Sequence, residues 1–399
     1  WCNCTRRTSL TRFYPPMVEV QIYRKVGVVM FDLVIRNART LTGETMDIGI
    51  NDEKIQKIAT SIPEKGKTEQ TLQAGHYLSA GWIDDHVHCF EEMTLYYDYP
   101  DQIGVSKGVT TVIDAGTTGA ENIHQFYERA KKAKTNVYAL LNISKWGIVE
   151  QDELADLSKI QANLVKEKLT EFPEFIVGIK ARMSKTVVGN NGLTPLEWAK
   201  KIQKENHQIP LMVHIGSAPP HLEEILQLLE KGDILTHCFN GKDNGIMEKE
   251  THQIKPFVKD ALAKGVIFDI GHGTDSFNFE VAKAAYDQGI KADSISTDIY
   301  IRNRKNGPVY DLATTMEKLH FIGYSWSEIL EKVTCVPAEN FHLGTKGQIE
   351  VGFDADFTIF EFVDQEKTIT DSNGQQQVID QQIKPVSVVI GGKSYECKL

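Results

Sequence analysis

The chain has 399 residues, of which 41% are hydrophobic and 25% charged, and its 44 basic and 54 acidic side chains give a formal net charge of -10. This composition is that of a soluble globular protein and excludes the disordered, collagen-like and membrane-spanning classes. The acidic balance argues against nucleic acid and anionic membrane surfaces as partners, because both require a basic footprint.

Six cysteines are scattered along the chain without a Cys-x-x-Cys pair or a dense framework. That distribution is typical of a reducing compartment. No apolar run approaches the ~20 residues that a membrane helix needs. We therefore expect a cytoplasmic protein that acts on a small-molecule substrate, with no nucleic-acid or membrane partner, and we leave a homo-oligomer open.

The first 29 residues lack the apolar region and the small-residue cleavage site of a signal peptide. Met30 is followed at once by FDLVIRNART, which has the pattern of a β-strand. We expect Met30 to be the natural start and residues 1–29 to be an added extension.

Both ends of the remaining chain show short apolar alternations separated by turn residues, which is typical of strands. Near the N-terminal end these runs are DLVIRNA, DIGINDEKIQKIA and TLQAGHYLSA; near the C-terminal end they are FDADFTIFEF, QVIDQQI and VSVVIGGKSYECKL. The last group suggests a hairpin around Asn373-Gly374. Because each group is too small to bury a core alone, we predict that residues 30–80 and 343–399 form one β-sandwich domain.

Residues 81–342 have a different hydrophobicity pattern, in which near-continuous apolar runs alternate with amphipathic segments. That alternation is typical of a parallel sheet covered by helices on its faces. There are eight such runs: WIDDHVH, VTTVIDA, NVYALLNIS, FIVGIKA, PLMVHIG, DILTHCF, VIFDIG and DSISTD. They predict an α/β fold with a (β/α)8 barrel of the TIM type. A doubly wound open sheet is the alternative, but the Gly-rich phosphate loop expected after its first strand is missing.

Six polar residues stand at or near the C-terminal ends of five of these runs, on the face where barrel enzymes build their active sites. They are His86, His88, Lys180, His214, His237 and Asp298. Neutral imidazole and carboxylate are ligands of Zn2+, so the set predicts a metal site. Lys180 fits as a ligand only when burial lowers its pKa and the neutral amine reacts with carbon dioxide, because the resulting carbamate is an anion that can bridge two metals.

The same residues carry a resemblance to a known family. GWIDDHVH matches the Gly-x-x-Asp-x-His-x-His opening of the amidohydrolase superfamily, and the later residues follow in the order of its binuclear branch with a carboxylated lysine. The segment PAENFHLGTKGQIEVGFDADFTIFEF is similar to the closing segment of that superfamily. Within it, the chain resembles the dihydroorotase-like and deacetylase-type hydrolases.

This resemblance implies a role for each residue. His86, His88 and Asp298 would hold one divalent metal, most simply Zn2+, and His214 and His237 would hold a second. Carboxylated Lys180 would bridge the two together with a hydroxide, and Asp298 would carry the proton from the attacking water to the leaving group. Lys180 and Asp298 are therefore the expected catalytic residues.

Five further residues at the expected barrel mouth are candidates for substrate binding. Arg182 could hold a substrate carboxylate, as could Arg302. Asn240, His272 and Tyr300 could donate hydrogen bonds to a substrate oxygen.

Three functions compete for such a site: hydrolysis of an amide or ester, deamination of a nucleobase, and a scaffold without metals. A scaffold would not need the complete ligand set. The mononuclear deaminases of the superfamily place a glutamate shortly after the histidine of the fifth strand, whereas His214 is followed by Ile-Gly-Ser. Dihydroorotases have an arginine two residues after His-x-His, where this chain has Phe90. We therefore predict a deacetylase-like hydrolase of a small acyl substrate, such as an acetylated amino or hydroxy acid, with a cyclic amidase as the alternative and a nucleobase deaminase as the less favoured one.

Overall fold

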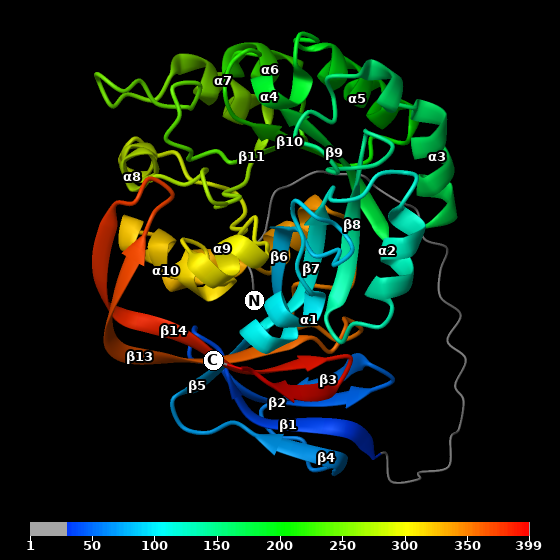
Figure 1. Cartoon of the computed structure of the whole chain (residues 1–399). Helices are drawn as coiled ribbons and strands as arrows, with labels where there is room; N and C mark the ends of the chain where they lie inside the picture. The colour runs from blue at the N-terminus through cyan, green and yellow to red at the C-terminus, as the bar shows by residue number, and fades with distance from the viewer. Residues whose placement is uncertain (1–29, 399) are drawn as a thin grey trace.

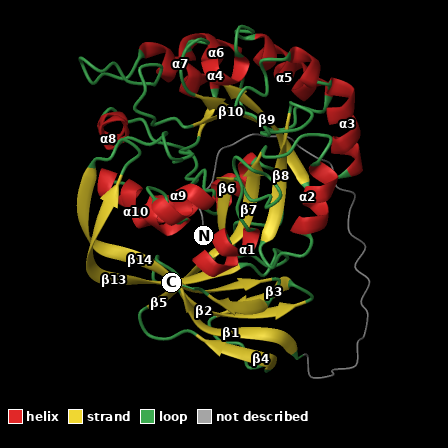
Figure 2. Cartoon of the chain, viewed as in Figure 1, coloured by secondary structure: helices red, strands yellow, loops and turns green. Residues whose placement is uncertain are grey.

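A computed structural model describes residues 30–398 of the chain, so the prediction for residues 1–29 lies outside the described residues (Figure 1). A curved parallel sheet surrounded by helices forms the larger part of the molecule, and two small sheets lie beneath it (Figure 2). This arrangement confirms the predicted fold class of a barrel-type sheet with an appended β-domain. The exact domain boundaries at residues 80 and 343 stay a prediction.

The two small sheets are built from the two ends of the chain, and the second sheet combines strands from both ends. One has the strand order β3-β2-β1-β4, and the other, β15-β14-β13-β5, is antiparallel throughout. Leu33 and Ile48 from the first sheet pack with Leu78 and Phe357 from the second in one buried cluster, which confirms that the two ends share a core. The strands are β1 (Phe31–Arg39), β2 (Thr45–Asn51), β3 (Lys54–Ala59), β4 (Gly66–Thr71), β5 (His76–Ala80), β13 (Phe357–Thr370), β14 (Gln376–Ile390) and β15 (Lys393–Glu396).

The central sheet has seven parallel strands that neighbour one another in chain order, from β6 to β12. Strands such as β6, β7 and β9 are buried along nearly their whole length, as expected for a sheet covered by helices. The strands are β6 (Trp82–Val87), β7 (Val109–Ala115), β8 (Asn136–Asn142), β9 (Ile176–Met183), β10 (Leu211–Ile215), β11 (Ile234–Thr236) and β12 (Ile267–Phe268).

The eighth predicted strand, DSISTD, is not a regular strand. Its β-bridges to the described neighbouring strands are two isolated parallel ones, Asp269 with Ser294 and Val87 with Ile299. The Asp84 side chain accepts hydrogen bonds from both the backbone N–H and the hydroxyl of Thr297. A carboxylate from β6 therefore takes a hydrogen bond that a strand ladder would otherwise make, and the segment closes the barrel without becoming a strand.

Helices follow most of the parallel strands, as predicted. The α-helix that follows β8 begins only at Ala162. No helix among residues 30–398 is long and apolar enough to cross a membrane. The helices are α1 (Pro100–Ile103), α2 (Ile123–Ala130), α3 (Ala162–Glu171), α4 (Lys185–Val188), α5 (Thr194–Glu205), α6 (Leu222–Leu228), α7 (Pro256–Lys264), α8 (Phe279–Asp287), α9 (Ile301–Asn306), α10 (Leu312–Ile322), α11 (Trp326–Lys332) and α12 (Cys335–Asn340), with short 3-10 turns at η1 (Val105–Lys107) and η2 (Leu157–Lys159).

The predicted hairpin around Asn373-Gly374 is present and is unusually long. Its strands β13 and β14 leave the small sheets and run past α10 toward α8 (Figure 1). Lys367 of β13 forms an ion pair with Glu317 of α10 at 2.6 Å, and the Ile383 N–H of β14 donates to the same carboxylate. The hairpin is thereby fixed to the wall of the barrel, with its tip near the strand ends.

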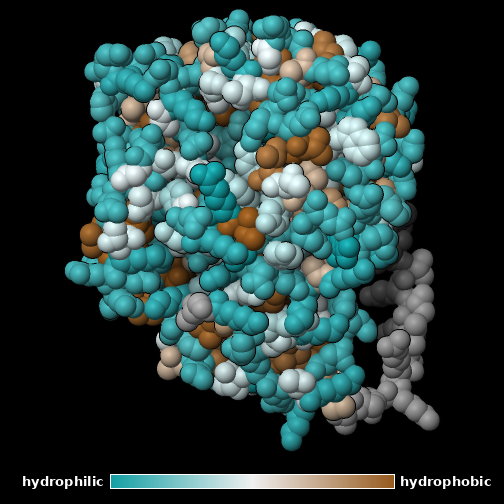
Figure 3. All heavy atoms as spheres, in the orientation of Figure 1, coloured by the Kyte–Doolittle hydropathy of each residue, from teal (hydrophilic) through white to brown (hydrophobic). Residues whose placement is uncertain are grey.

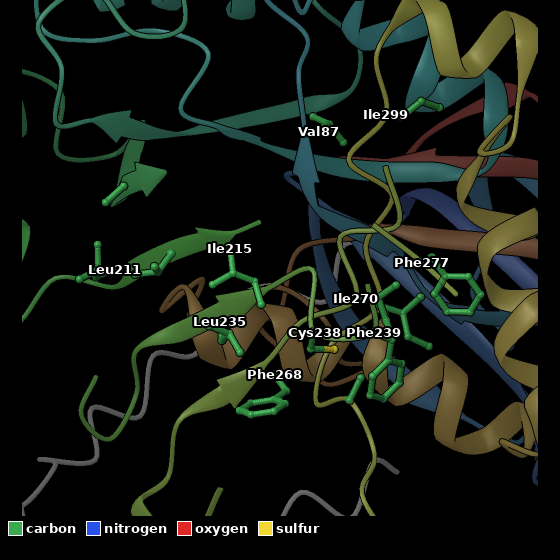
Figure 4. Packing of buried hydrophobic residues seen from close by; sticks show 14 of the residues in the cluster. Val87, Leu211, Ile215, Leu235, Cys238, Phe239, Phe268, Ile270, Phe277 and Ile299 are labelled. Atoms are coloured by element: carbon green, nitrogen blue, oxygen red, sulfur yellow. The ribbon is translucent and has the colours of Figure 1, made fainter. Parts of the chain in front are cut away.

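The main hydrophobic core lies between the parallel sheet and its helices. Leu211 and Ile215 of β10, Leu235 of β11 and Phe268 of β12 are all buried in it (Figure 4). Cys238 also packs in this core. The outer face in Figure 3 is mostly hydrophilic, with hydrophobic side chains in small patches.

Candidate metal centre and substrate pocket

Strand alternation directs the predicted ligands into the barrel. On β10, Leu211, Val213 and Ile215 belong to the outer core, whereas Met212 belongs to the cluster inside the barrel. Since side chains two residues apart share a face, His214 projects inward above Met212. Lys180 of β9 pairs in register with Met212 and lies in the same layer.

His86, His88 and Asp298 meet at one end of the barrel. Asp298 Oδ1 lies 3.2 Å from His88 Nε2 and 3.4 Å from His86 Nε2. The backbone supports this meeting, because the Asp298 N–H donates to the His86 carbonyl at 2.6 Å and the His88 N–H donates to the Ile299 carbonyl at 2.9 Å. One atom each of His86, His237 and Asp298 fall within 4.8 Å of one another, a spacing that suits a metal ion.

The remaining predicted ligands lie directly beside these three. The ring centroid of His237 is 5.1 Å from that of His86 and 4.5 Å from that of His214. Lys180 Nζ is 3.2 Å from His86 Nε2. The structure thus brings all six predicted residues together from the ends of four strands, β6, β9, β10 and β11, and from the closing segment.

Neighbours on the Nδ1 side determine the tautomers of two of these histidines. The single hydroxyl hydrogen of Thr236 is donated to Asp269, so its oxygen accepts from His86 Nδ1 at 2.8 Å. Thr117 likewise donates to Asp114 and accepts from His88 Nδ1 at 2.7 Å.

His237 Nδ1 donates to the Gly271 carbonyl at 2.6 Å, which sets the tautomer of a third histidine. In each of the three rings the proton is therefore on Nδ1, and the lone pair of Nε2 is left free. That is the arrangement that metal-binding histidines require.

The protonation states also suit cation binding. Burial lowers the pKa of His86 and of His214 well below the usual value and that of His237 to about 4, so all three rings are neutral near pH 7. Burial opposes ionisation of Asp298, but its contact with His88 and the proximity of His237 and Lys180 outweigh it and lower the pKa of Asp298.

Lys180 is the one cationic residue within this cluster. Its side chain is buried, and among the described residues its Nζ contacts only His86 Nε2 and the Met212 sulfur, at 3.2 and 3.1 Å. Burial lowers the pKa of Lys180 to about 7. A substantial share of the side chain is therefore a neutral amine at physiological pH.

Two of the predicted ligands have a backbone conformation that is unusual for residues other than glycine. His237 has φ 67° and Asp298 has φ 50°. Such left-handed conformations cost free energy and concentrate at functional sites. Here each occurs where the chain leaves the barrel and turns its side chain toward the centre.

A polar pocket of about 300 Å3 opens above the cluster. His214 and Asp298 form its floor, and Arg182, Lys242 and Arg302 bring positive charge to its wall. The other lining residues are Tyr96, Gln151, Ser184, Thr186, Gly216, Ser217, Thr274, Asp275, Ser276 and Tyr300.

The five predicted substrate-binding residues divide into two groups. Arg182, Arg302 and Tyr300 line the pocket, although Arg182 also forms a buried ion pair with Glu153 at 3.0 Å. Asn240 is buried, and its side chain holds the backbone of His237 and Lys242 rather than facing this pocket.

His272 is the clearest departure from that prediction. It is fully buried, with Nδ1 bonded to the Gly273 carbonyl and Nε2 bonded to Lys318. Neither ring nitrogen of His272 is left to bind a substrate.

Sequence reasoning missed three groups that shape the site. Thr117 and Thr236 orient ligands, but a buried threonine in a strand gives no functional signal in the sequence. Tyr96 stacks near His88 and Tyr300, at ring distances of 5.4 and 4.9 Å. Lys242 follows His237 by five residues, and that spacing from a predicted ligand was the one available clue.

Comparisons with known proteins agree with this architecture. A family model described as a deacetylase-like composite domain matches residues 349–396. A deacetylase of Enterococcus faecalis is 66% identical over 366 residues, covering 92% of this chain and 99% of the relative. A solved structure described as an adenine deaminase is 66% identical, with a TM-score of 0.91 over 92% of this chain and 100% of its own. Another, described as a dihydroorotase, is 35% identical, with a TM-score of 0.84 over 92% and 97%.

Proposed function

We propose, from the premise that this chain belongs to the deacetylase family of the amidohydrolase superfamily, that it hydrolyses the acyl bond of a small amide or ester. Because it belongs to this family, the chain is a metal-dependent hydrolase of the deacetylase type. The observation that carries the proposal is the convergence of His86 Nε2, His88 Nε2 and Asp298 Oδ1 beneath a polar pocket.

We assign His86, His88 and Asp298 to one divalent metal and His214 and His237 to a second. Nitrogen and oxygen ligands of this kind suit Zn2+, which we propose as the metal. Two such cations would supply a water of lowered pKa and a Lewis acid for the substrate carbonyl, which is the chemistry that acyl hydrolysis needs.

Lys180 is the proposed bridge between the two positions. Its buried, partly neutral amine can add to the carbon of carbon dioxide and release one proton, which gives an anionic carbamate. The charge of the site supports this assignment, because an ammonium among metal ligands would repel the cations in a sheltered environment. Conversion to a carbamate lowers the charge of the side chain by two units and adds two oxygen ligands.

Asp298 is the proposed proton carrier. Its Oδ1 contacts the two histidines, while its side chain is 18% exposed and lines the pocket floor. Because its pKa is lowered, the carboxylate is ionised at neutral pH and can accept a proton from the attacking water. The same carboxyl group then gives this proton to the departing amine or alcohol.

The pocket wall indicates an anionic substrate. Lys242 and Arg302 form no ion pair within residues 30–398, whereas Arg182 already has Glu153 as its partner. Free cations at a polar wall suit a carboxylate that stands some distance from the scissile bond. We therefore propose acetylated amino or hydroxy acids as the substrate class.

A substrate panel tests this proposal. Zinc-loaded protein is assayed with N-acetyl amino acids, O-acetyl hydroxy acids, cyclic amides and adenine, and Asp298→Asn serves as the inactive control. We expect turnover of an acetylated acid, release of acetate and no turnover by the control. Turnover of adenine alone would favour the activity named for the 66% identical structure, and turnover of a cyclic amide alone would favour that named for the dihydroorotase.

A further inference from the structure

The turn from Gly271 to Gly273 touches two of the proposed metal ligands. The Gly271 carbonyl accepts the Nδ1 proton of His237, and a Cβ atom built on Gly271 would lie 2.9 Å from that nitrogen and 2.2 Å from Thr236 Oγ1. A Cβ atom on Gly273 would lie 2.4 Å from Asp298 Oδ2. The backbone of this turn is therefore in direct contact with both ligands, and only glycine fits at its two ends.

Backbone hydrogen bonds tie the same turn to the segment that carries Asp298. The His272 N–H donates to the Ser296 carbonyl at 3.1 Å, and the Gly273 N–H donates to the Thr297 carbonyl at 2.8 Å. A displacement of the turn would thus move Asp298 and would also change the acceptor of His237.

Lys318 of α10 holds the turn from outside the barrel. Its buried Nζ donates to His272 Nε2 at 2.8 Å and to the Pro308 carbonyl at 2.7 Å. His272 Nδ1 donates to the Gly273 carbonyl, and the His272 ring stacks on Phe277 with ring centroids 4.8 Å apart.

Lys318 forms no ion pair with any residue of the described part of the chain. A buried lysine without a counter-ion is costly. Its structural contribution is therefore the fixing of His272 rather than neutralisation of a charge.

Ser372, at the tip of the β13–β14 hairpin, holds the turn from another direction. Its hydroxyl lies 3.1 Å from the Gly273 carbonyl and 3.3 Å from the His272 carbonyl. The Ser372 N–H donates to the Phe277 carbonyl at 2.9 Å. The hairpin itself is fixed to α10 by the pair of Lys367 with Glu317, one residue before Lys318.

We propose that Lys318 and Ser372 are positioning residues of the metal centre, which fix the Gly271–Gly273 turn and through it the orientation of His237 and Asp298. Neither residue contacts a ligand or the substrate pocket. The proposal rests on the metal site of the proposed function, and it is independent of which acyl compound is hydrolysed.

Cobalt binding provides the test, because the visible spectrum of Co2+ reports the geometry of its ligands without a substrate. Chelator-treated protein and the variants Lys318→Met and Ser372→Ala are titrated with Co2+, and bound metal and absorption are recorded. Lys332→Met, which removes a lysine of α11 that contacts the Tyr324 ring, and Ser394→Ala, which removes a serine of β15, are the matched controls.

We expect Lys318→Met to weaken Co2+ binding by about 10-fold or more and to alter the visible bands, as happens when residues behind metal ligands are removed. Ser372→Ala should also weaken Co2+ binding and alter the visible bands, but to a smaller extent than Lys318→Met. In the double variant the fold-loss of Co2+ affinity should be smaller than the product of the two single losses, because both residues act on the same turn. The two controls should match the wild type.

A folded Lys318→Met protein with wild-type cobalt affinity and spectrum would overturn the inference. If Lys318→Met does not fold, Ser372→Ala provides the test. Wild-type cobalt affinity and spectrum in Ser372→Ala would then overturn the inference. A wild type that binds no Co2+ would refute both this inference and the metal site. A wild type that binds Co2+ but hydrolyses no acyl compound would refute only the proposed function.

Discussion

Thr236 determines how His86 presents its free nitrogen. We predict that Thr236→Val, which keeps the shape and removes the acceptor for His86 Nδ1, weakens metal binding about 10- to 100-fold. The fold should survive, because Asp269 keeps its hydrogen bonds from Ser294 and Ser296. Competition with a chelator of known affinity measures the change.

Thr110→Val is the matched control for this experiment. Thr110 is a fully buried threonine at the start of β7, where its hydroxyl donates to the Trp82 carbonyl at 3.2 Å. It faces no proposed ligand, so the affinity for metal should stay within about 2-fold of the wild type. An equal loss in both variants would mean that general damage to the sheet, and not the tautomer of His86, weakens binding.

The proposed binding of two metals depends on Lys180. We predict that Lys180→Ala lowers the metal content from two equivalents to one or none and abolishes hydrolysis, because two cations would then lack their bridging anion. A short carboxylic acid added to the variant should restore part of both. Elemental analysis and the hydrolytic assay measure the outcome, and continuous density for a free amine in active, metal-loaded protein would contradict it.

Among the connecting elements, the loop before β13 depends on one buried lysine. Lys346 lies 2.9 Å from Asp354 and 2.7 Å from Asp356, and its side chain is only 7% exposed. We predict that Lys346→Met lowers the free energy of unfolding by about 3–5 kcal/mol, because it leaves buried carboxylates with too little positive charge. Lys393→Met, at an exposed pair with Glu53, should cost less than about 0.5 kcal/mol in the same urea titration.

Helix α11 begins at a capping box whose glutamate gives a pH-dependent stability. Burial opposes ionisation of Glu328, but hydrogen bonds from Lys291 and Ser325 outweigh it and lower the pKa of Glu328 to about 2. A lowered pKa stabilises the folded state above the unfolded pKa of about 4.3, and that stabilisation is lost as the pH falls toward 2.

We therefore predict that Glu328→Gln lowers the free energy of unfolding at pH 7 by about 1 kcal/mol, a value reduced for screening because the side chain is 36% exposed. The difference from the wild type should shrink between about pH 4.5 and 2. Urea unfolding at several pH values measures it. Glu331→Gln on the same helix is the control and should show no such trend.

At the scale of the whole molecule, the proposed ligands connect distant parts of the sheet. His86 is on β6, His214 on β10 and Asp298 on the closing segment. A metal bound only by the folded chain stabilises it by about 2.7 kcal/mol at a concentration 100 times Kd. We predict that chelation lowers the melting temperature and that added Zn2+ restores it. An unchanged melting temperature in protein shown to have lost its metal would contradict this prediction.

The general fold and the ligand cluster could be predicted because both follow from local patterns. Alternation marks the strands at the two ends of the chain, and apolar runs mark the strands of the parallel sheet. In such a barrel the C-terminal strand ends share one face, so the order of His86, Lys180, His214, His237 and Asp298 was enough to place them together.

The remaining features depend on contacts that no local pattern records. The eighth apolar run, DSISTD, has strand-like residues, yet the Thr297 N–H donates its hydrogen bond to the Asp84 carboxylate and the run does not form a regular strand. His272 looked suited to a substrate because it follows a strand, but Lys318 occupies its free nitrogen. Each of these contacts joins residues far apart in sequence, so only the folded chain shows it.

The shared sandwich core has a consequence for synthesis on the ribosome. Ala80 of β5 pairs with Phe357 of β13, although about 280 residues separate them. At 5–20 residues per second, the first strands wait roughly 14 to 55 seconds for their partners to be translated. During that interval β5 has an open edge and Leu78 is not yet covered by Phe357, so a nascent chain stalled before β13 should bind chaperones through residues 31–80 even when its barrel helices have already formed.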